Sequence, residues 1–131
     1  MHKAVFLDRD GTIIEDVGYL NNPNDIKFIP GSIEAIKQLN KTGYKVIVIT
    51  NQSGVARGLI AEDMLQTIDK TMQKHILSGG AHLDAIYYCP HHPDHGHYPH
   101  KQNCKCRKPN PGMLKKAAKD HNIDLNQSFM I

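Results

Sequence analysis

Two aspartates follow the first apolar stretch of the 131-residue chain and are separated by a single residue. The segment from Val5 to Ile14 reads VFLDRDGTII, so Asp8 and Asp10 come directly after a strand-forming run. Such a strand delivers its acids to the carboxyl edge of a sheet, where open α/β folds place their chemistry. We therefore expect Asp8 and Asp10 to be catalytic. The alternative is a hairpin, because Asp10-Gly11 between apolar runs is also a turn signal.

A second polar group follows another apolar run, Val46 to Ile49. Its sequence, Thr50-Asn51-Gln52-Ser53-Gly54, offers a hydroxyl, an amide and free backbone N–H groups. Loops of this kind bind phosphate through backbone donors and a hydroxyl. Ordinary strand-to-helix turn chemistry is the alternative.

The segment from Cys89 to Lys108 is rich in histidine and cysteine and shows no apolar periodicity. A loop without apolar residues cannot bury itself, so another interaction must hold it. The C-x-H and C-x-C spacings predict a structural zinc with a Cys₃His shell, against the alternative of a reduced, exposed loop. The expected ligands are Cys89, His91, Cys104 and Cys106. The other histidines, His92, His95, His97 and His100, are expected to face solvent.

The remaining pattern alternates strands and helices. Strands are expected at 4–7, 46–49, 85–88 and 128–131, and helices after Pro30-Gly31, over 61–78 and after Pro111-Gly112. Doubly buried strands that alternate with helices indicate an α/β fold with a Rossmann-like parallel sheet and helices on both faces. Met64, Ile68, Met72 and Ile76 form the core stripe of the long helix. The polar stretch 8–28 is long enough to be a lid or binding flap.

Composition limits the classes of partner. At this length we expect one domain, residues 1–131, with a zinc-binding loop at 89–106. Sixteen Lys and Arg against 13 Asp and Glu give a small, dispersed excess that suits an anionic small molecule rather than nucleic acid. Apolar runs are too short to span a membrane. We therefore expect a cytoplasmic protein, monomeric, with no membrane or nucleic-acid partner.

Three segments together carry a family resemblance. VFLDRDGT, TNQSG and CRKPNPGM resemble the first three motifs of the haloacid dehalogenase-like phosphatase superfamily. TNQSGVARG, the flap at Asp16-Val17-Gly18-Tyr19 and the CPHH…CKCRKPNPGM loop are more narrowly similar to the D-glycero-D-manno-heptose 1,7-bisphosphate 7-phosphatases. The resemblance implies hydrolysis of the 7-phosphate of a sugar bisphosphate through an aspartyl-phosphate, with Mg²⁺ and Zn²⁺ as cofactors. It also implies a place in ADP- or GDP-heptose and lipopolysaccharide biosynthesis.

The same resemblance implies the residue roles. Asp8 is the expected nucleophile and Asp10 the expected general acid and base. Mg²⁺ would be held by the Asp8 carboxylate, the Asp10 main-chain carbonyl and the substrate phosphate. Lys108 would offset negative charge, and Arg107 would bind the phosphate that is not cleaved. The expected substrate-binding residues are Arg9, Asp16, Gly18, Tyr19, Thr50, Asn51, Gln52, Ser53, Arg107 and Lys108.

Three other functions remain open from the residues. Histidinol-phosphate phosphatases have a zinc loop of the same kind, but their second motif resembles TNQDG, and Ser53 argues against them. A nucleic-acid 3′-phosphatase would want a basic groove with aromatic platforms, and this chain has no Trp and three Phe. A non-catalytic zinc module is the third possibility.

The position of Ile131 gives one further expectation. Members of the superfamily carry a fourth, acidic motif just after the strand that begins here at Ser128, and its carboxylate completes the magnesium shell. The sequence stops before that position. We therefore expect a domain whose C-terminal part is absent, nearly inactive and aggregation-prone by itself.

Overall fold

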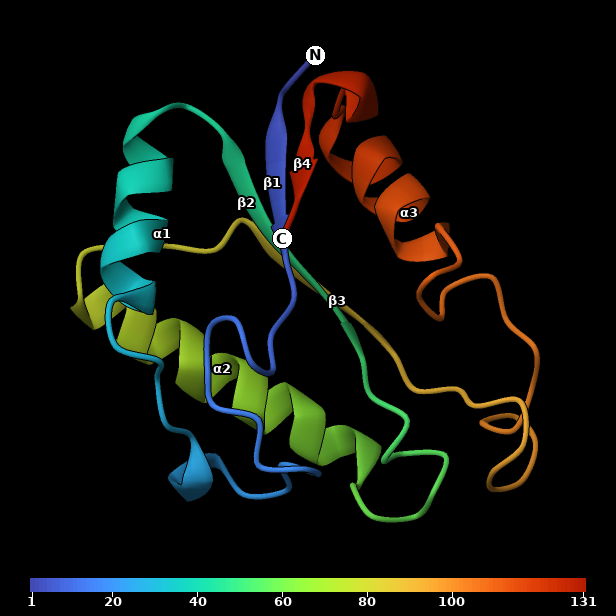
Figure 1. Ribbon diagram of the computed structural model, residues 1–131. Helices are drawn as coiled ribbons and strands as arrows, with labels where there is room; N and C mark the ends of the chain where they lie inside the picture. The colour runs from blue at the N-terminus through green and yellow to red at the C-terminus, as the bar shows by residue number, and fades with distance from the viewer.

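A computed structural model describes all residues from 1 to 131. Its centre is a sheet of four parallel strands in the order β3-β2-β1-β4 (Figure 1). The strands are β1 (Ala4–Leu7), β2 (Lys45–Asn51), β3 (Ala85–Cys89) and β4 (Phe129–Met130). The helices are α1 (Ser32–Lys41), α2 (Glu62–Ser78) and α3 (Gly112–His121), with 3₁₀ turns at Pro23–Asp25 and Leu125–Gln127. The α/β architecture expected from the sequence is confirmed.

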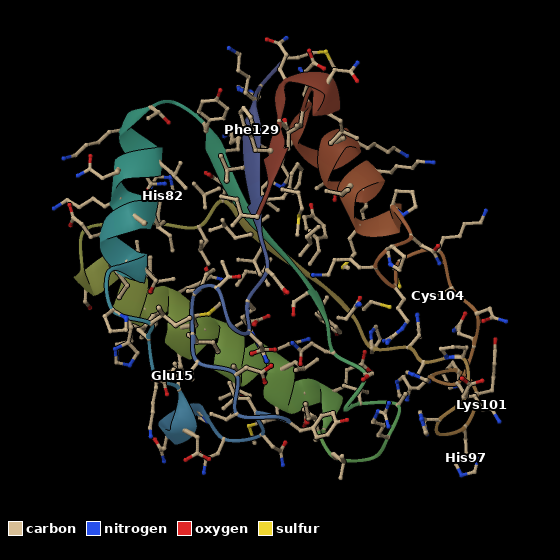
Figure 2. All side chains as sticks on the ribbon, in the orientation of Figure 1. Glu15, His82, His97, Lys101, Cys104 and Phe129 are labelled. Atoms are coloured by element: carbon tan, nitrogen blue, oxygen red, sulfur yellow. The ribbon has the colours of Figure 1, made fainter.

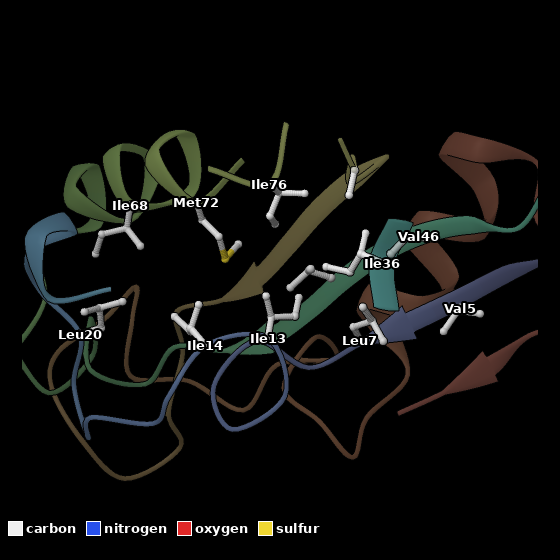
Figure 3. Packing of buried hydrophobic residues seen from close by; sticks show 12 residues of the cluster. Val5, Leu7, Ile13, Ile14, Leu20, Ile36, Val46, Ile68, Met72 and Ile76 are labelled. Carbon is white, nitrogen blue, oxygen red and sulfur yellow. The ribbon is translucent and has the colours of Figure 1, made fainter. Parts of the chain in front are cut away.

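Alternate residues of β1 and β2 build the two halves of the core. One set of strand residues packs with α1 and α2, and Figure 3 shows Val5, Leu7 and Val46 facing Ile36 and Ile76. The other set packs with α3 on the opposite face, in a cluster that contains Ala4, Phe6, Ile47, Ile49, Met113 and Ala117. Because side chains alternate along a strand, an apolar run without polar interruption fits a sheet covered on both faces. The predicted placement of helices on both faces is therefore confirmed.

The long helix α2 differs from its expected core stripe in its first turn. Ile68, Met72 and Ile76 are fully buried, as the four-residue spacing predicts. Leu65 is also fully buried, whereas Met64 is only partly buried. An α-helix turns once in 3.6 residues, so four-residue steps drift around its surface. At the start of α2 the inward position has therefore passed to Leu65, which packs with Val55 and Ile60 in a small cluster of their own.

The flap between β1 and α1 has its own apolar anchor. Ile13, Ile14 and Leu20 are almost completely buried against the α1 and α2 side of the core. An antiparallel bridge pairs Ile14 with Phe28, which brings the two ends of the flap together. The polar residues between these anchors are thereby held above the edge of the sheet. None of the helices combines the length and apolar character that a membrane crossing requires.

Candidate active site and metal centre

The carboxyl ends of β1 and β2 lie side by side, because Leu7 pairs with Val48 in the parallel ladder. Asp8 and the segment that starts at Thr50 therefore leave the sheet at the same edge. The hairpin considered for Asp10-Gly11 is wrong, since β1 pairs only in parallel with its neighbours. A cavity of about 240 Å³ opens at this edge. It is lined by Asp8, Asp10, Asp16, Gly18, Tyr19, Thr50, Asn51, Gln52, Ser53 and Gly54.

Asp8 presents its carboxylate to the cavity. Its Oδ1 atom accepts the backbone N–H of Arg9 at 2.9 Å and lies 3.1 Å from Nζ of Lys108. The side chain is 40% exposed, so a ligand in the cavity can reach it. The remaining oxygen, Oδ2, makes none of the hydrogen bonds that the fold supplies to this group. A carboxylate with one free oxygen beside an ammonium group suits a nucleophile for a phosphoryl group or a ligand for a hard cation.

Asp10 is held more tightly than Asp8. Arg9 donates to it twice, from Nε to Oδ1 at 3.0 Å and from Nη2 to Oδ2 at 3.1 Å. Gln52 adds a third bond, from Nε2 to Oδ2 at 3.2 Å, and also donates to Oγ1 of Thr50 at 2.9 Å. Both carboxylate oxygens thus have protein donors, and the Asp10 side chain is 22% exposed. The two aspartates therefore differ in freedom although both line the cavity.

The side chain of Asn51 holds the backbone of Lys108. The Lys108 N–H donates to Oδ1 of Asn51 at 2.9 Å, and Nδ2 of Asn51 donates to the Lys108 carbonyl at 3.2 Å. Nζ of Lys108 in turn donates to the carbonyl of Ile49 at 3.1 Å, at the end of β2. These contacts aim the lysine at Asp8 from a segment distant in the sequence.

The flap supplies the opposite wall of the cavity. Oδ1 of Asp16 accepts the N–H of Gly18 at 2.9 Å, which closes a tight turn. Gly18 has φ of +88°, a left-handed conformation that strongly favours glycine. Tyr19 follows and is 45% exposed, and the guanidinium of Arg57 lies 6.0 Å from its ring centroid. The flap thus adds a carboxylate and an aromatic residue to the cavity that the two aspartates line.

The four expected zinc ligands converge at the end of β3. Their donor atoms all lie within 4.8 Å of one another. Sγ of Cys104 is 3.4 Å from Sγ of both Cys89 and Cys106, and Nδ1 of His91 is 3.3 Å from Sγ of Cys106. Three thiols and one imidazole at this separation match the donor set of a closed tetrahedral zinc site. The cluster can hold a zinc ion, and Figure 2 shows Cys104 on the loop with Lys101 and His97.

The protonation of the thiols reflects their surroundings. Burial raises the pKa of the Cys89 thiol, and it raises the pKa of Cys106 as well. Burial also acts against ionisation of Cys104, but hydrogen bonds from the other two thiols and from the Arg107 N–H lower its pKa to about 6. A metal must displace the remaining protons, so its affinity depends on pH.

Two contacts seat the outer part of the loop on the body of the protein. Nε2 of His100 lies 3.1 Å from Oε2 of Glu62, and Oε1 of the same glutamate accepts the hydroxyl of Tyr88 at 3.1 Å. A Cβ atom at Gly96 would collide with the carbonyl of Ala56, so the loop backbone touches the segment after β2. His100 is therefore half-buried and paired, and the expectation that it faces solvent is wrong.

The zinc cluster leads directly into the cationic side of the active site. The N–H of Arg107 donates to Sγ of Cys104 at 3.3 Å, and Lys108 follows. Nη1 of Arg107 is buried and has no hydrogen-bond partner. Buried donors in native proteins are almost always satisfied, so this atom is available to an anionic ligand.

The fold thus gathers the predicted site residues in one region. Arg9, Arg107 and Lys108 are not among the residues that line the cavity, and the side chain of Arg9, 1% exposed, donates to Asp10 instead. No motif in the sequence pointed to Glu62 or Asp69, both on α2. Burial raises the pKa of Asp69 to about 6, although the charge of Arg9 opposes the shift. A polar residue on the inward side of an amphipathic helix was the only signal for Asp69.

Known proteins resemble the whole length of this chain. A family model described as polynucleotide kinase 3 phosphatase matches residues 3–131. A D-glycero-beta-D-manno-heptose-1,7-bisphosphate 7-phosphatase of Pasteurella multocida is 50% identical over 131 residues, which cover 100% of this chain and 71% of the relative. An Escherichia coli K12 protein of the same name is 44% identical over 128 residues, 98% of this chain and 67% of the relative.

Two crystal structures share the fold. A putative had-like phosphatase from Mesorhizobium loti superposes with a TM-score of 0.92 at 36% identity, over 98% of this chain and 62% of that one. A D,D-heptose 1.7-bisphosphate phosphatase from B. bronchiseptica, complexed with magnesium and phosphate, gives 0.81 at 38% identity, over 94% and 65%. The chain therefore spans slightly less than two thirds of the length of these two structures.

Proposed function

The chain belongs to the haloacid dehalogenase-like phosphatases, within the polynucleotide kinase 3 phosphatase family, and we propose that it hydrolyses the 7-phosphate of D-glycero-D-manno-heptose 1,7-bisphosphate. The observation that carries the proposal is the meeting of Asp8 and Asp10 at one cavity, with Nζ of Lys108 3.1 Å from Asp8. Relatives named for this activity match the chain from end to end. The reaction belongs to the assembly of nucleotide-activated heptose.

The arrangement supports a double displacement. An oxygen of Asp8 attacks phosphorus, and the bond from phosphorus to the sugar oxygen breaks as that oxygen takes a proton from Asp10. Asp10 then takes a proton from a water molecule whose oxygen attacks the aspartyl-phosphate, which releases inorganic phosphate and restores Asp8. Lys108 offsets negative charge during both steps from its position 3.1 Å from Asp8. Thr50, Asn51 and Ser53 form the wall that faces the phosphoryl group.

The residues present fit a magnesium ion. The cavity wall is almost entirely polar and offers carboxylate, amide and hydroxyl oxygens, which are the ligands of a hard cation. Asp8 has a free carboxylate oxygen for it, whereas the carboxylate of Asp10 already accepts three donors, which leaves the main-chain carbonyl of Asp10 as the expected second ligand. When bound, Mg²⁺ would neutralise phosphate charge and orient the phosphoryl group for in-line attack.

The substrate preference is proposed from the second phosphate. Arg107 carries a buried donor without a partner, held beside Lys108 by the zinc cluster. A guanidinium in this position suits the phosphate that is not cleaved. The flap residues Asp16, Gly18 and Tyr19 would contact the sugar between the two phosphates.

Phosphate release in Mg²⁺ buffer tests the proposal. The substrates are the heptose 1,7-bisphosphate, histidinol phosphate and an oligonucleotide with a 3′-phosphate. We expect the bisphosphate to give the highest kcat/KM. A preference for histidinol phosphate or for the oligonucleotide would replace the proposed substrate. The assay uses this chain and a form extended to the full length of its relatives. No release from any of the three substrates by either form would refute the enzyme itself and favour a non-catalytic zinc module.

A variant of Arg107 tests the second phosphate site. Loss of a charged hydrogen bond whose partner stays charged costs about 2 kcal/mol or more, so Arg107→Ala should lower kcat/KM on the bisphosphate at least about 30-fold. The loss on the heptose 7-monophosphate should be several times smaller. Lys105→Ala, which removes an exposed charge from the same loop, is the matched control. Equal losses on both substrates would show that Arg107 only supports the loop.

A further inference from the structure

Arg9 is the one charged side chain in the fully buried core, with 1% of its surface exposed. Burying a guanidinium is costly unless partners replace the lost water, and an apolar residue of similar volume often does as well for stability. A buried arginine between two active-site aspartates therefore calls for an explanation beyond packing. Its contacts supply one.

The geometry of the Arg9 pair is bidentate. Nε and Nη2 donate to the two different oxygens of Asp10, at 3.0 and 3.1 Å. Parallel bonds of this kind fix the plane of a carboxylate as well as its position. Gln52, only 4% exposed, adds its bond at 3.2 Å from another strand end. Asp8 receives no such clamp, since its side-chain contacts come from one backbone N–H and one ammonium group, that of Lys108.

The local backbone holds Arg9 in this place. Its carbonyl oxygen accepts the N–H groups of Ile13 at 2.9 Å and Ile14 at 3.2 Å, and both isoleucines are almost completely buried. The turn after β1 is thereby closed on the backbone of Arg9. Asp69 on α2 adds a half-buried carboxyl group whose charge interacts with that of Arg9.

We propose that Arg9 is a positioning residue that fixes the carboxylate plane of Asp10 for proton transfer to the leaving sugar oxygen, with Gln52 as its auxiliary. The proposal rests on the proposed function, because it assigns Asp10 the proton transfer of that reaction. A carboxylate has about four acceptor directions, so three bonds from the protein leave one for the substrate side. Fixing the plane aims that direction at the cavity. The proton leaves Asp10 as the bond from phosphorus to the sugar oxygen breaks, and the electron pair stays on that oxygen.

The test uses the leaving group. Expulsion of a sugar alkoxide needs a proton, whereas dinitrophenolate leaves without one, so a defect in proton donation affects the first ester and spares the second. First-turnover release by rapid quench isolates this step from the later hydrolysis, which uses Asp10 as a base. The variants are Arg9→Met, which keeps the length of the side chain without donors, and Arg9→Lys, which keeps the charge without the fork.

We expect Arg9→Met to slow first-turnover release from the heptose bisphosphate by about 100-fold, the size of a general-acid contribution. Release from dinitrophenyl phosphate should change less than about threefold, and KM should change little for either ester. Arg9→Lys should recover part of the loss on the sugar ester. Gln52→Met should show the same selectivity with a smaller loss, and it carries the test if Arg9→Met does not fold.

Parallel losses on both esters in Arg9→Met and Gln52→Met would overturn the proposal and leave both residues a structural role. Undiminished release from the sugar ester would overturn it as well. A wild-type protein that releases neither leaving group would refute the proposed function, and the role of Arg9 with it. Ile36→Val, a conservative change in the core away from the cavity, is the control for loss of packing and should slow neither ester by more than about twofold.

Discussion

Replacing Asp69 by asparagine should stabilise the protein at neutral pH. Asp69 lies half-buried on α2, and burial raises its pKa from 3.8 to about 6 while Arg9 opposes the shift. Between these two values the folded state binds more protons than the unfolded chain. The free energy of unfolding therefore falls as the pH rises through this window and stays lower above it.

The size of the effect follows from the shift. A difference of about two pKa units corresponds to about 3 kcal/mol of lost stability at pH 7. An asparagine carries no charge and avoids this penalty, so Asp69→Asn should raise the melting temperature by up to about 10 °C for a domain of this size. Near pH 4 Asp69 is neutral in the folded protein and about half protonated in the unfolded chain, so most of the difference should be gone.

Urea unfolding of wild type and variant at pH 7 and pH 4 measures both statements. Effects of pH on other groups cancel in the difference between the two proteins. Asp63→Asn, an exposed substitution of the same kind in the first turn of α2, is the control and should be slightly destabilising at pH 7. A loss of stability in Asp69→Asn at pH 7 would refute the reasoning, because the attraction to Arg9 would then outweigh the cost of burial.

Two further variants test the active site and the zinc cluster. Asp8→Asn should lower turnover to below a tenth of wild type, because the amide is a poor nucleophile. The melting temperature should change little, because the side chain is 40% exposed. Phosphate release and thermal melting measure the two effects, and near-normal turnover would exclude Asp8 as the nucleophile. Cys106→Ser should lower the zinc content of the protein and reduce its activity, because Lys108 would be displaced. Metal analysis measures the zinc content, and full zinc content would show that the cluster does not need this thiol.

Most of the fold could be predicted because the local patterns are strong. β1 and the centre of β2, residues 46–49, are unbroken apolar runs, and α2 repeats its apolar residues over four turns, so their existence and type follow from the sequence. The order of the strands in the sheet does not follow from local patterns. It depends on contacts between distant segments, such as the pairing of Val5 with both Val46 and Phe129, which no local pattern encodes.

The candidate site, like the fold, could be predicted only in part from the sequence. Parallel strands end at a common edge, so the meeting of Asp8 with Thr50 could be inferred from two short motifs. The direction of a side chain in a turn depends on what folds against it. Arg9 and Gln52 were expected to contact substrate, but the structure places their polar groups on Asp10, and contact with substrate stays a prediction for both. His100 likewise finds Glu62 only in the folded protein.

The central position of β1 has a consequence for how the chain folds. This strand contains residues 4–7 but pairs with β4 at the other end of the sequence, and the bond from the Ala4 N–H to Oγ of Ser128 joins residues 124 positions apart. Contacts between such distant segments slow folding, because loop entropy is lost before the contact stabilises anything. Until β4 arrives, one edge of a fully apolar strand stays open. Partly folded chains can therefore pair with each other at that edge, and dilute, slow refolding should favour the native protein.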